Sequence, residues 1–252
     1  MFKQKFLTAA VASALLAGAG VSQAQEKDDM DVVSGDGFEI SGNIALTSDY
    51  RFRGISQSDE SAAVQGGFDV EFSPGFYIGT WGSTVDFDSN EGYDGSLELD
   101  YYAGWTSAIG DTDFGIDVGY IYYDYPGDNG DEGDYQEFYV SGSWKDFSVS
   151  VNYSDDYYAE TDEFWYYAAH YSVTLVENLS LGLHVGYNKL EQGGGFLSSD
   201  EDNYTDYSVS LSYAVAGVDL SVAYVGTTLD EDDVFGTDWG DDTAVFTISK
   251  SM

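Results

Sequence analysis

Apolar and polar residues alternate along most of the chain after residue 38. The alternation is clearest over 40–47, 97–106, 147–153, 179–188, 208–213 and 218–224. A period of two predicts β-strands that turn one apolar face to a single side. No comparable 3.6-residue pattern follows the first 24 residues, so the pattern predicts an all-β protein.

The connections between these segments alternate between short and long. Short turns fall at 73–75, 108–111, 145–146, 176–178 and 215–217, and longer polar stretches at 51–60, 87–94, 124–133, 154–162, 189–202 and 227–240. This layout, with short periplasmic turns and long external loops, is typical of outer-membrane barrels. It predicts twelve strands, at about 39–50, 61–72, 76–86, 95–107, 112–123, 134–144, 146–154, 163–175, 179–188, 203–214, 217–227 and 241–251.

We therefore predict a transmembrane, antiparallel, up-and-down β-barrel. The expected strands match the 9–11 residues that a tilted membrane strand needs. Closure removes the edge N–H and C=O groups that lipid cannot satisfy. The parity of the third strand stays open: either Phe76 and Ile78, or Tyr77, Trp81 and Val85, face outward.

The N-terminus has the features of a secretory signal. Lys3 and Lys5 precede an apolar run at 6–21, and small residues then predict cleavage before Gln25. An uncleaved N-terminal anchor is the alternative. The expected organisation is a signal peptide over 1–24, a short periplasmic segment over 25–38 and the barrel over 39–252.

The charge balance is strongly acidic, with eight basic against 46 acidic residues and a net charge of −38. Nucleic acid is a poor partner for such a chain. Aromatic residues make up 17%, which argues against disorder. Many lie near the ends of predicted strands, where interfacial girdles are expected: Tyr50, Phe52, Phe72, Phe76, Tyr122, Tyr123, Tyr125, Trp144, Phe147, Tyr153, Tyr157, Tyr158, Phe164, Trp165, Tyr187, Tyr204, Tyr213 and Trp239.

The segment 48–59, where the first strand becomes the first long loop, holds Asp49 and two of the few basic residues, Arg51 and Arg53. These arginines either face carboxylates at a constriction of the lumen or pin the first loop by ion pairs. Further acidic residues are expected to face inward: Asp69, Glu71, Glu98, Asp100, Asp117, Glu137 and Asp219. Such a lumen would favour cations over anions; the alternative is a plugged interior without conduction.

Two histidines are expected to lie opposite each other in the lumen if the turn after residue 175 centres on Glu177. A metal is one reading of His170 and His184, but without a third ligand we assign no metal site. His170 and Ser172 share a face, which leaves a barrel acyl hydrolase as a weaker alternative; we predict no enzyme and no cofactor. The acidic loops could hold Ca²⁺ or Mg²⁺ weakly, although charge runs are usually solvated.

The stretch SGNIALTSDYRFRGISQSD over 41–59, followed by AAVQGGFDVEFSPGFYIGTWGS over 62–83, resembles the TorF family of outer-membrane porins. LELDYYAGW at 97–105 and VFTISKSM at 245–252 extend the similarity over the mature chain. Barrels of this kind usually end in an aromatic residue, whereas this chain ends in Met252. The family pattern is matched at Asp49, Arg51, Arg53, Gly54, Gln57, Gln65, Gly66, Gly67, Gly75, Tyr77, Gly79, Trp81 and Ser83.

The resemblance implies an outer-membrane location, contact with lipid and lipopolysaccharide, and insertion by the barrel-assembly machinery. Together with the charge balance, it predicts a porin-like channel for passive diffusion of ions or small solutes, with a preference for cations. A non-conducting structural or adhesive surface barrel is the alternative.

Overall fold

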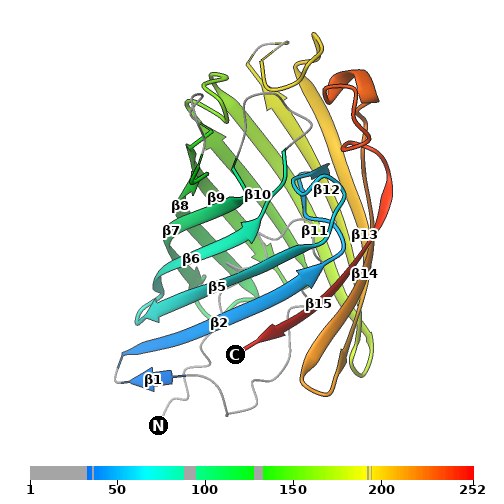
Figure 1. The fold of residues 1–252 in the computed structure, drawn as a ribbon. Helices are drawn as coiled ribbons and strands as arrows, with labels where there is room; N and C mark the ends of the chain where they lie inside the picture. The colour runs from blue at the N-terminus through cyan, green and yellow to red at the C-terminus, as the bar shows by residue number, and fades with distance from the viewer. Residues whose placement is uncertain (1–32, 36, 88–94, 128–132, 192, 194) are drawn as a thin grey trace.

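The computed structural model describes residues 33–35, 37–87, 95–127, 133–191, 193 and 195–252 (Figure 1). The expected signal peptide, with its cleavage site, and most of the segment before the barrel lie outside the described residues. Among the described residues, no helix is long and apolar enough to cross a membrane.

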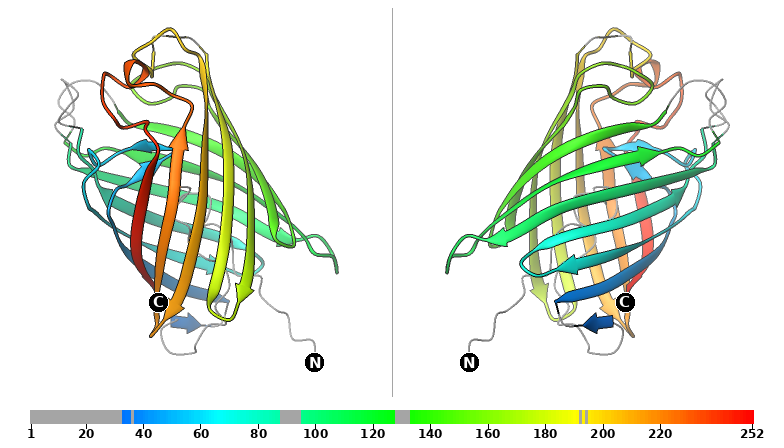
Figure 2. Two further views of the ribbon diagram at one scale, coloured as in Figure 1. Left: turned by 90° about the vertical axis from the view of Figure 1, so that its right-hand side faces the viewer. Right: turned by 90° about the vertical axis from the view of Figure 1, so that its left-hand side faces the viewer.

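Twelve tilted antiparallel strands form a closed barrel (Figures 1 and 2). Each strand pairs with its neighbours in sequence, and the first, β2, pairs with both β5 and the last strand, β15, which closes the ring. The barrel strands are β2 (Phe38–Thr47), β5 (Ala63–Phe72), β6 (Phe76–Thr84), β7 (Leu97–Ala108), β8 (Phe114–Asp124), β9 (Tyr135–Trp144), β10 (Phe147–Ser154), β11 (Phe164–Val176), β12 (Leu179–Leu190), β13 (Asn203–Val215), β14 (Val218–Thr227) and β15 (Thr243–Ser251).

Three short elements complete the fold. β1 (Val33–Gly35) pairs with the start of β2, below the part of that strand that β15 covers. A hairpin of β3 (Arg51–Phe52) and β4 (Ile55–Ser56) follows β2, and a 3₁₀ turn, η1 (Glu231–Asp233), lies in the last long loop. The C-terminus lies at the end of the barrel that carries the short turns (Figure 1).

The predicted number and order of barrel strands are confirmed, and most boundaries differ by one or two residues. The largest difference is at the first strand, which ends at Thr47 and not at residue 50. The parity of β6 is now settled, because Phe76 and Ile78 are 57% and 51% exposed while Tyr77 is 2% exposed. Phe76 and Ile78 therefore face outward.

The outside of the barrel is apolar. Large exposed side chains come from nearly every strand and include Ile44, Phe68, Ile78, Phe138, Val149, Val185, Val222 and Phe246. A surface of this kind is expected where a barrel faces lipid. The period of two therefore places apolar residues outside and polar residues inside, the reverse of a soluble sheet.

Inward glycines make room for inward aromatic rings. A Cβ atom at Gly104 would lie 2.2 Å from the hydroxyl of Tyr77, and one at Gly79 would lie 2.3 Å from the ring of Tyr102. These two pairs join β6 to β7 in both directions. Glycine inside a strand often marks such a close approach, and here it lets rings lie flat against the inner wall.

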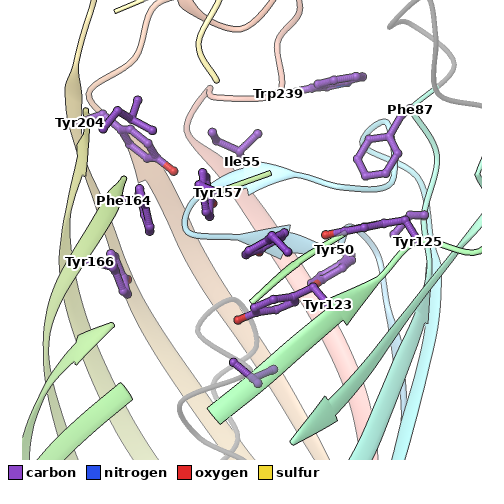
Figure 3. Close-up of a cluster of buried hydrophobic side chains, with 14 of the residues drawn as sticks. Tyr50, Ile55, Phe87, Tyr123, Tyr125, Tyr157, Phe164, Tyr166, Tyr204 and Trp239 are labelled. Atoms are coloured by element: carbon purple, nitrogen blue, oxygen red, sulfur yellow. The ribbon is translucent and has the colours of Figure 1, made fainter. Parts of the chain in front are cut away.

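The expected aromatic girdles are correct only in part. Phe72, Phe76, Trp144, Phe147, Tyr187 and Tyr213 are exposed on the outside. Others from the same set are buried inside the barrel and its loops, where they form one cluster (Figure 3): Tyr50, Tyr123, Tyr125, Tyr157, Phe164, Tyr204 and Trp239. Within the strands, parity separates the two groups, because Tyr123, Phe164 and Tyr204 lie on the inward parity of their strands. The other buried members, Tyr50, Tyr125, Tyr157 and Trp239, lie in the loops.

Candidate functional site

The segment 48–60, named here the inward segment, turns into the barrel. Tyr50, Arg51, Arg53 and Ile55 are all buried. Figure 3 shows Tyr50 and Ile55 among rings that project from the wall and the loops. The inward segment therefore fills part of the lumen near the end that carries the long loops.

The tip of the inward segment is a two-residue hairpin turn. Phe52 pairs with Ile55, and Arg53 and Gly54 between them have φ angles of 48° and 85°. Two positive φ angles are typical of a type I′ turn, which glycine favours. A Cβ at Gly54 would lie 2.4 Å from the side chain of Thr227, so the tip packs directly on the inner face of β14.

Arg51 joins the two ends of the inward segment to the last long loop. Its guanidinium donates to the Asp49 carboxylate at 2.5 Å and to Glu60 at 3.2 Å. It also donates to the backbone carbonyls of Gly54, Trp239 and Asp241. Arg51 is 1% exposed, so these contacts hold a buried guanidinium between the inward segment and the last long loop.

Arg53 reaches across the lumen to the opposite wall. It donates to Glu137 of β9 at 2.7 Å, and Asn152 donates to the same carboxylate oxygen at 2.9 Å. The guanidinium also lies 4.3 Å from the ring centroid of Tyr166 and 4.8 Å from that of Phe164. Arg53 is 2% and Glu137 0% exposed, so this ion pair is buried. Removing one partner of such a buried pair strongly destabilises the folded protein, because the other charge stays buried without compensation.

Other acidic side chains line the wall around and below this pair. Glu98 accepts from Tyr50 at 3.1 Å and lies beside Asp100 on the inner face of β7. Asp69 accepts from Tyr102 at 2.6 Å, and Asp117 accepts from Tyr77 at 2.7 Å. Glu71 and Asp219 follow on the inward parity of β5 and β14, nearer the short turns.

His170 and His184 are direct partners across β11 and β12. Their Nδ1 atoms are 3.1 Å apart, and Nε2 of His184 lies 2.5 Å from the carboxylate of Asp206. The sequence reasoning did not single out Asp206. Its alternation with Tyr204 and Ser208 on β13 carried the signal, because all three share the inward face.

A half-open pocket of about 590 Å³, counting the solvent at its mouth, lies above the inward segment. Its lining is mostly aromatic, and it includes Phe52, Phe87, Tyr125, Tyr135, Tyr157, Tyr158, Phe196, Tyr204 and Trp239. In the last long loop, carboxylate oxygens of Glu231, Asp238 and Asp241 lie within 4.8 Å of one another and are exposed. These carboxylates alone do not define a cation site.

At the rim of the barrel, Asp242 accepts hydrogen bonds from the hydroxyls of Tyr207 and Tyr224, each at 2.7 Å. These two bonds stabilise the charged form and lower the pKa of Asp242. The contacts tie the last loop to the outer edge of β13 and β14.

A family model described as "Bacterial protein of unknown function (Gcw_chp)" matches residues 32–252. The chain belongs to this family. The match does not carry the TorF name, so that resemblance stays a prediction. A comparison with curated proteins finds no match.

Solved porin structures share the fold of this Gcw_chp protein. The KdgM porin aligns with a TM-score of 0.53 and 12% identity over 84% of this chain and 97% of its own. The NanC porin aligns with a TM-score of 0.52 and 11% identity over 83% and 97%. KdgM has also been solved in complex with disordered oligogalacturonate, with a TM-score of 0.51 and 12% identity over 84% and 96%. At such identities the likeness shows the fold alone.

These solved relatives are porins and not enzymes. In the Gcw_chp protein, the side-chain partner of His170 is His184, and the backbone N–H of Ser172 donates to Asp146. Acyl transfer requires a serine hydroxyl hydrogen-bonded to a histidine base, whereas the ring nitrogen that lies 3.1 Å from Nδ1 of His170 belongs to His184.

Proposed function

We propose that this Gcw_chp protein is an outer-membrane, porin-like channel for passive diffusion of small solutes, with a preference for cations. The observation that supports this best is the balance of charge on the inner wall. Among the described residues, the basic side chains inside the barrel are Arg51 and Arg53, and each is paired with a carboxylate. The inward acidic residues outnumber them.

The unequal balance gives the lumen a negative potential. The charges of Arg51 and Arg53 are offset locally by Asp49, Glu60 and Glu137. Asp69, Asp117, Asp206 and Asp219 also lie on the inner wall, and the ion pairs of the two arginines do not include them. Rings of carboxylates in a narrow, low-dielectric passage favour cations and repel anions. A polyanion such as oligogalacturonate, which KdgM is described with, would be disfavoured here.

The inward segment sets the width of the passage. Because it fills part of the lumen, we expect small conductance and exclusion of large solutes. The apolar exterior, the closed sheet and the expected signal peptide support insertion in the outer membrane. Lipid and lipopolysaccharide are then the expected surroundings, and the barrel-assembly machinery is the expected route of insertion.

Reversal potentials across a tenfold KCl gradient, measured on refolded protein in a planar bilayer, test the proposal. We expect a cation-selective sign, below the roughly 59 mV of ideal selectivity. The double change Asp69→Asn with Asp117→Asn should lower the potential, whereas Asp111→Asn in an exposed turn should not. An anion-selective potential would overturn the proposal. No current in any salt would favour the structural or adhesive barrel.

A further pair of changes separates the two readings of the arginines. Arg51→Gln and Arg53→Gln should alter conductance through movement of the inward segment but leave the reversal potential unchanged, because both arginines are already paired. A larger cation-selective potential in either variant would instead place their charges in the ion path, because removing a positive charge there favours cations.

A further inference from the structure

The only two histidines of the chain meet on the inner wall of the barrel. His170 of β11 and His184 of β12 are opposite each other in the register, and their Nδ1 atoms are 3.1 Å apart. Their rings are tilted by 33° with centroids 4.4 Å apart. Two imidazole nitrogens at this separation either share one proton or bind one ion.

Asp206 fixes which nitrogen of His184 carries the proton. Its carboxylate lies 2.5 Å from Nε2 of His184, and it is itself held by Asn188 at 2.8 Å and by the hydroxyl of Tyr166 at 3.2 Å. Because the carboxylate accepts from Nε2, the lone pair of Nδ1 points toward His170. Histidines that bind metals are commonly oriented by a carboxylate at the other ring nitrogen.

The geometry of the pair suits a metal ion. The usual distance from a metal to an imidazole nitrogen is about 2.0–2.1 Å. With the two Nδ1 atoms 3.1 Å apart, a metal bound to both would have an N–metal–N angle of about 100°. That angle lies between those of square-planar and tetrahedral sites. The register places Ser148 beside His170 and Ser208 beside His184, so the surroundings are polar and can accommodate water ligands.

We propose that His170 and His184 form a binding site for a divalent first-row transition metal, with Asp206 as the residue that positions His184. Two imidazoles favour Cu²⁺ most, with Ni²⁺ and Zn²⁺ weaker. The sequence alone indicated the two histidines but no third residue that would favour a metal. The new observation is the buried carboxylate of Asp206 behind His184. Binding does not require conduction, so the site stands apart from the channel proposal.

Copper electron paramagnetic resonance on the refolded, full-length protein without a histidine tag tests the site. Since the chain has only two histidines, nitrogen hyperfine coupling from imidazole reports on this pair alone. We expect one equivalent of Cu²⁺ to show coupling to two nitrogens. Copper held by exposed carboxylates, such as those of Glu231, Asp238 and Asp241, gives an oxygen-only signal.

Three variants complete the test. His170→Asn and His184→Asn should each reduce the coupling to one nitrogen and weaken binding at least tenfold. Asp206→Asn should keep both nitrogens while weakening binding by roughly 10–100-fold, the usual effect of losing an orienting carboxylate. Glu177→Gln, in the exposed turn of the same hairpin, is the control and should bind as the wild type does.

An oxygen-only copper spectrum in the wild type would overturn the proposal, and would mean that the two rings share a proton instead. Two-nitrogen coupling that survives His170→Asn would also overturn it. Heat-modifiable migration in gels shows whether each variant has folded. The wild-type spectrum decides the question even if a variant does not fold.

Discussion

Neutralising Glu137 is expected to free the tip of the inward segment from the opposite wall of the barrel. Glu137 accepts the hydrogen bond of Arg53 at 2.7 Å, and both side chains are almost fully buried. Glu137→Gln keeps the size of the side chain and removes its charge. Arg53 then stays buried beside the rings of Tyr166 and Phe164 without an opposite charge.

The size of the effect follows from the burial of the pair. Truncating one partner of a buried, hydrogen-bonded ion pair costs about 2–5 kcal/mol. The cation–π contacts that remain, and the amide oxygen of glutamine, offset part of this loss, which leaves about 2–3 kcal/mol. Since 1.4 kcal/mol is a factor of ten, the population with the segment displaced should rise about 30- to 150-fold.

Trypsin measures this displacement directly, because it cleaves after arginine. The bonds that follow Arg51 and Arg53 are protected in the folded barrel, where both side chains are buried. Lys145 lies in an exposed turn and serves as the internal reference. We expect cleavage after Arg53 to accelerate in Glu137→Gln relative to cleavage after Lys145, with products identified by mass spectrometry.

The same substitution at an exposed site gives the matched control. Glu177→Gln should leave the cleavage pattern unchanged. Equal protection of Arg53 in the wild type and in Glu137→Gln would refute the reasoning, because it would show that the ion pair does not hold the segment. Rapid cleavage of the wild type after Arg51 or Arg53 would refute it as well.

Two further predictions concern stability. Gly104→Ala should lower the urea midpoint of unfolding, because overpacking against an inward ring costs about 1–3 kcal/mol. Gly142→Ala is the control and should be tolerated, since nothing lies within 4 Å of a Cβ atom there. An equal loss of stability at both sites would contradict the packing argument. Asp242 has a lowered pKa in the folded state. Its contribution to the stability of the barrel is therefore present above the pKa of the unfolded state and is lost as the pH falls through the pKa of the folded state. Loss of stability on acidification between those two values should be smaller when Tyr207 and Tyr224 are both changed to Phe, as measured by thermal melts; identical acid profiles would contradict it.

The barrel itself could be predicted because its pattern is local. A strand with one face in lipid repeats every two residues, and a short turn forces its neighbours to pair. Hence the strand from Leu179 to Leu190 was predicted within two residues of its observed end. Parity alone also indicated the inward carboxylates of β7, β8 and β9.

The inward segment could not be predicted in this way, because its conformation depends on distant contacts. Arg51 donates to the carbonyl of Trp239, which is 188 residues away in sequence. No periodicity connects two such positions. The aromatic residues show the same limit: Tyr123 and Tyr122 both lie near the end of β8, yet only Tyr123 shares the inward parity of Asp117.

The contacts of Trp239 indicate how the segment could move. Its carbonyl accepts from Arg51 and from the backbone N–H of Ser56, and its indole N–H donates to Asp59. The first and last long loops are therefore one hydrogen-bonded unit, held to the far wall mainly by Arg53. Losing the contact of Arg53 should free the tip while the base stays fixed at Trp239. A hinge at the base, and not expulsion of the whole segment, is thus the motion that the packing favours, and cleavage after Arg53 should precede cleavage after Arg51.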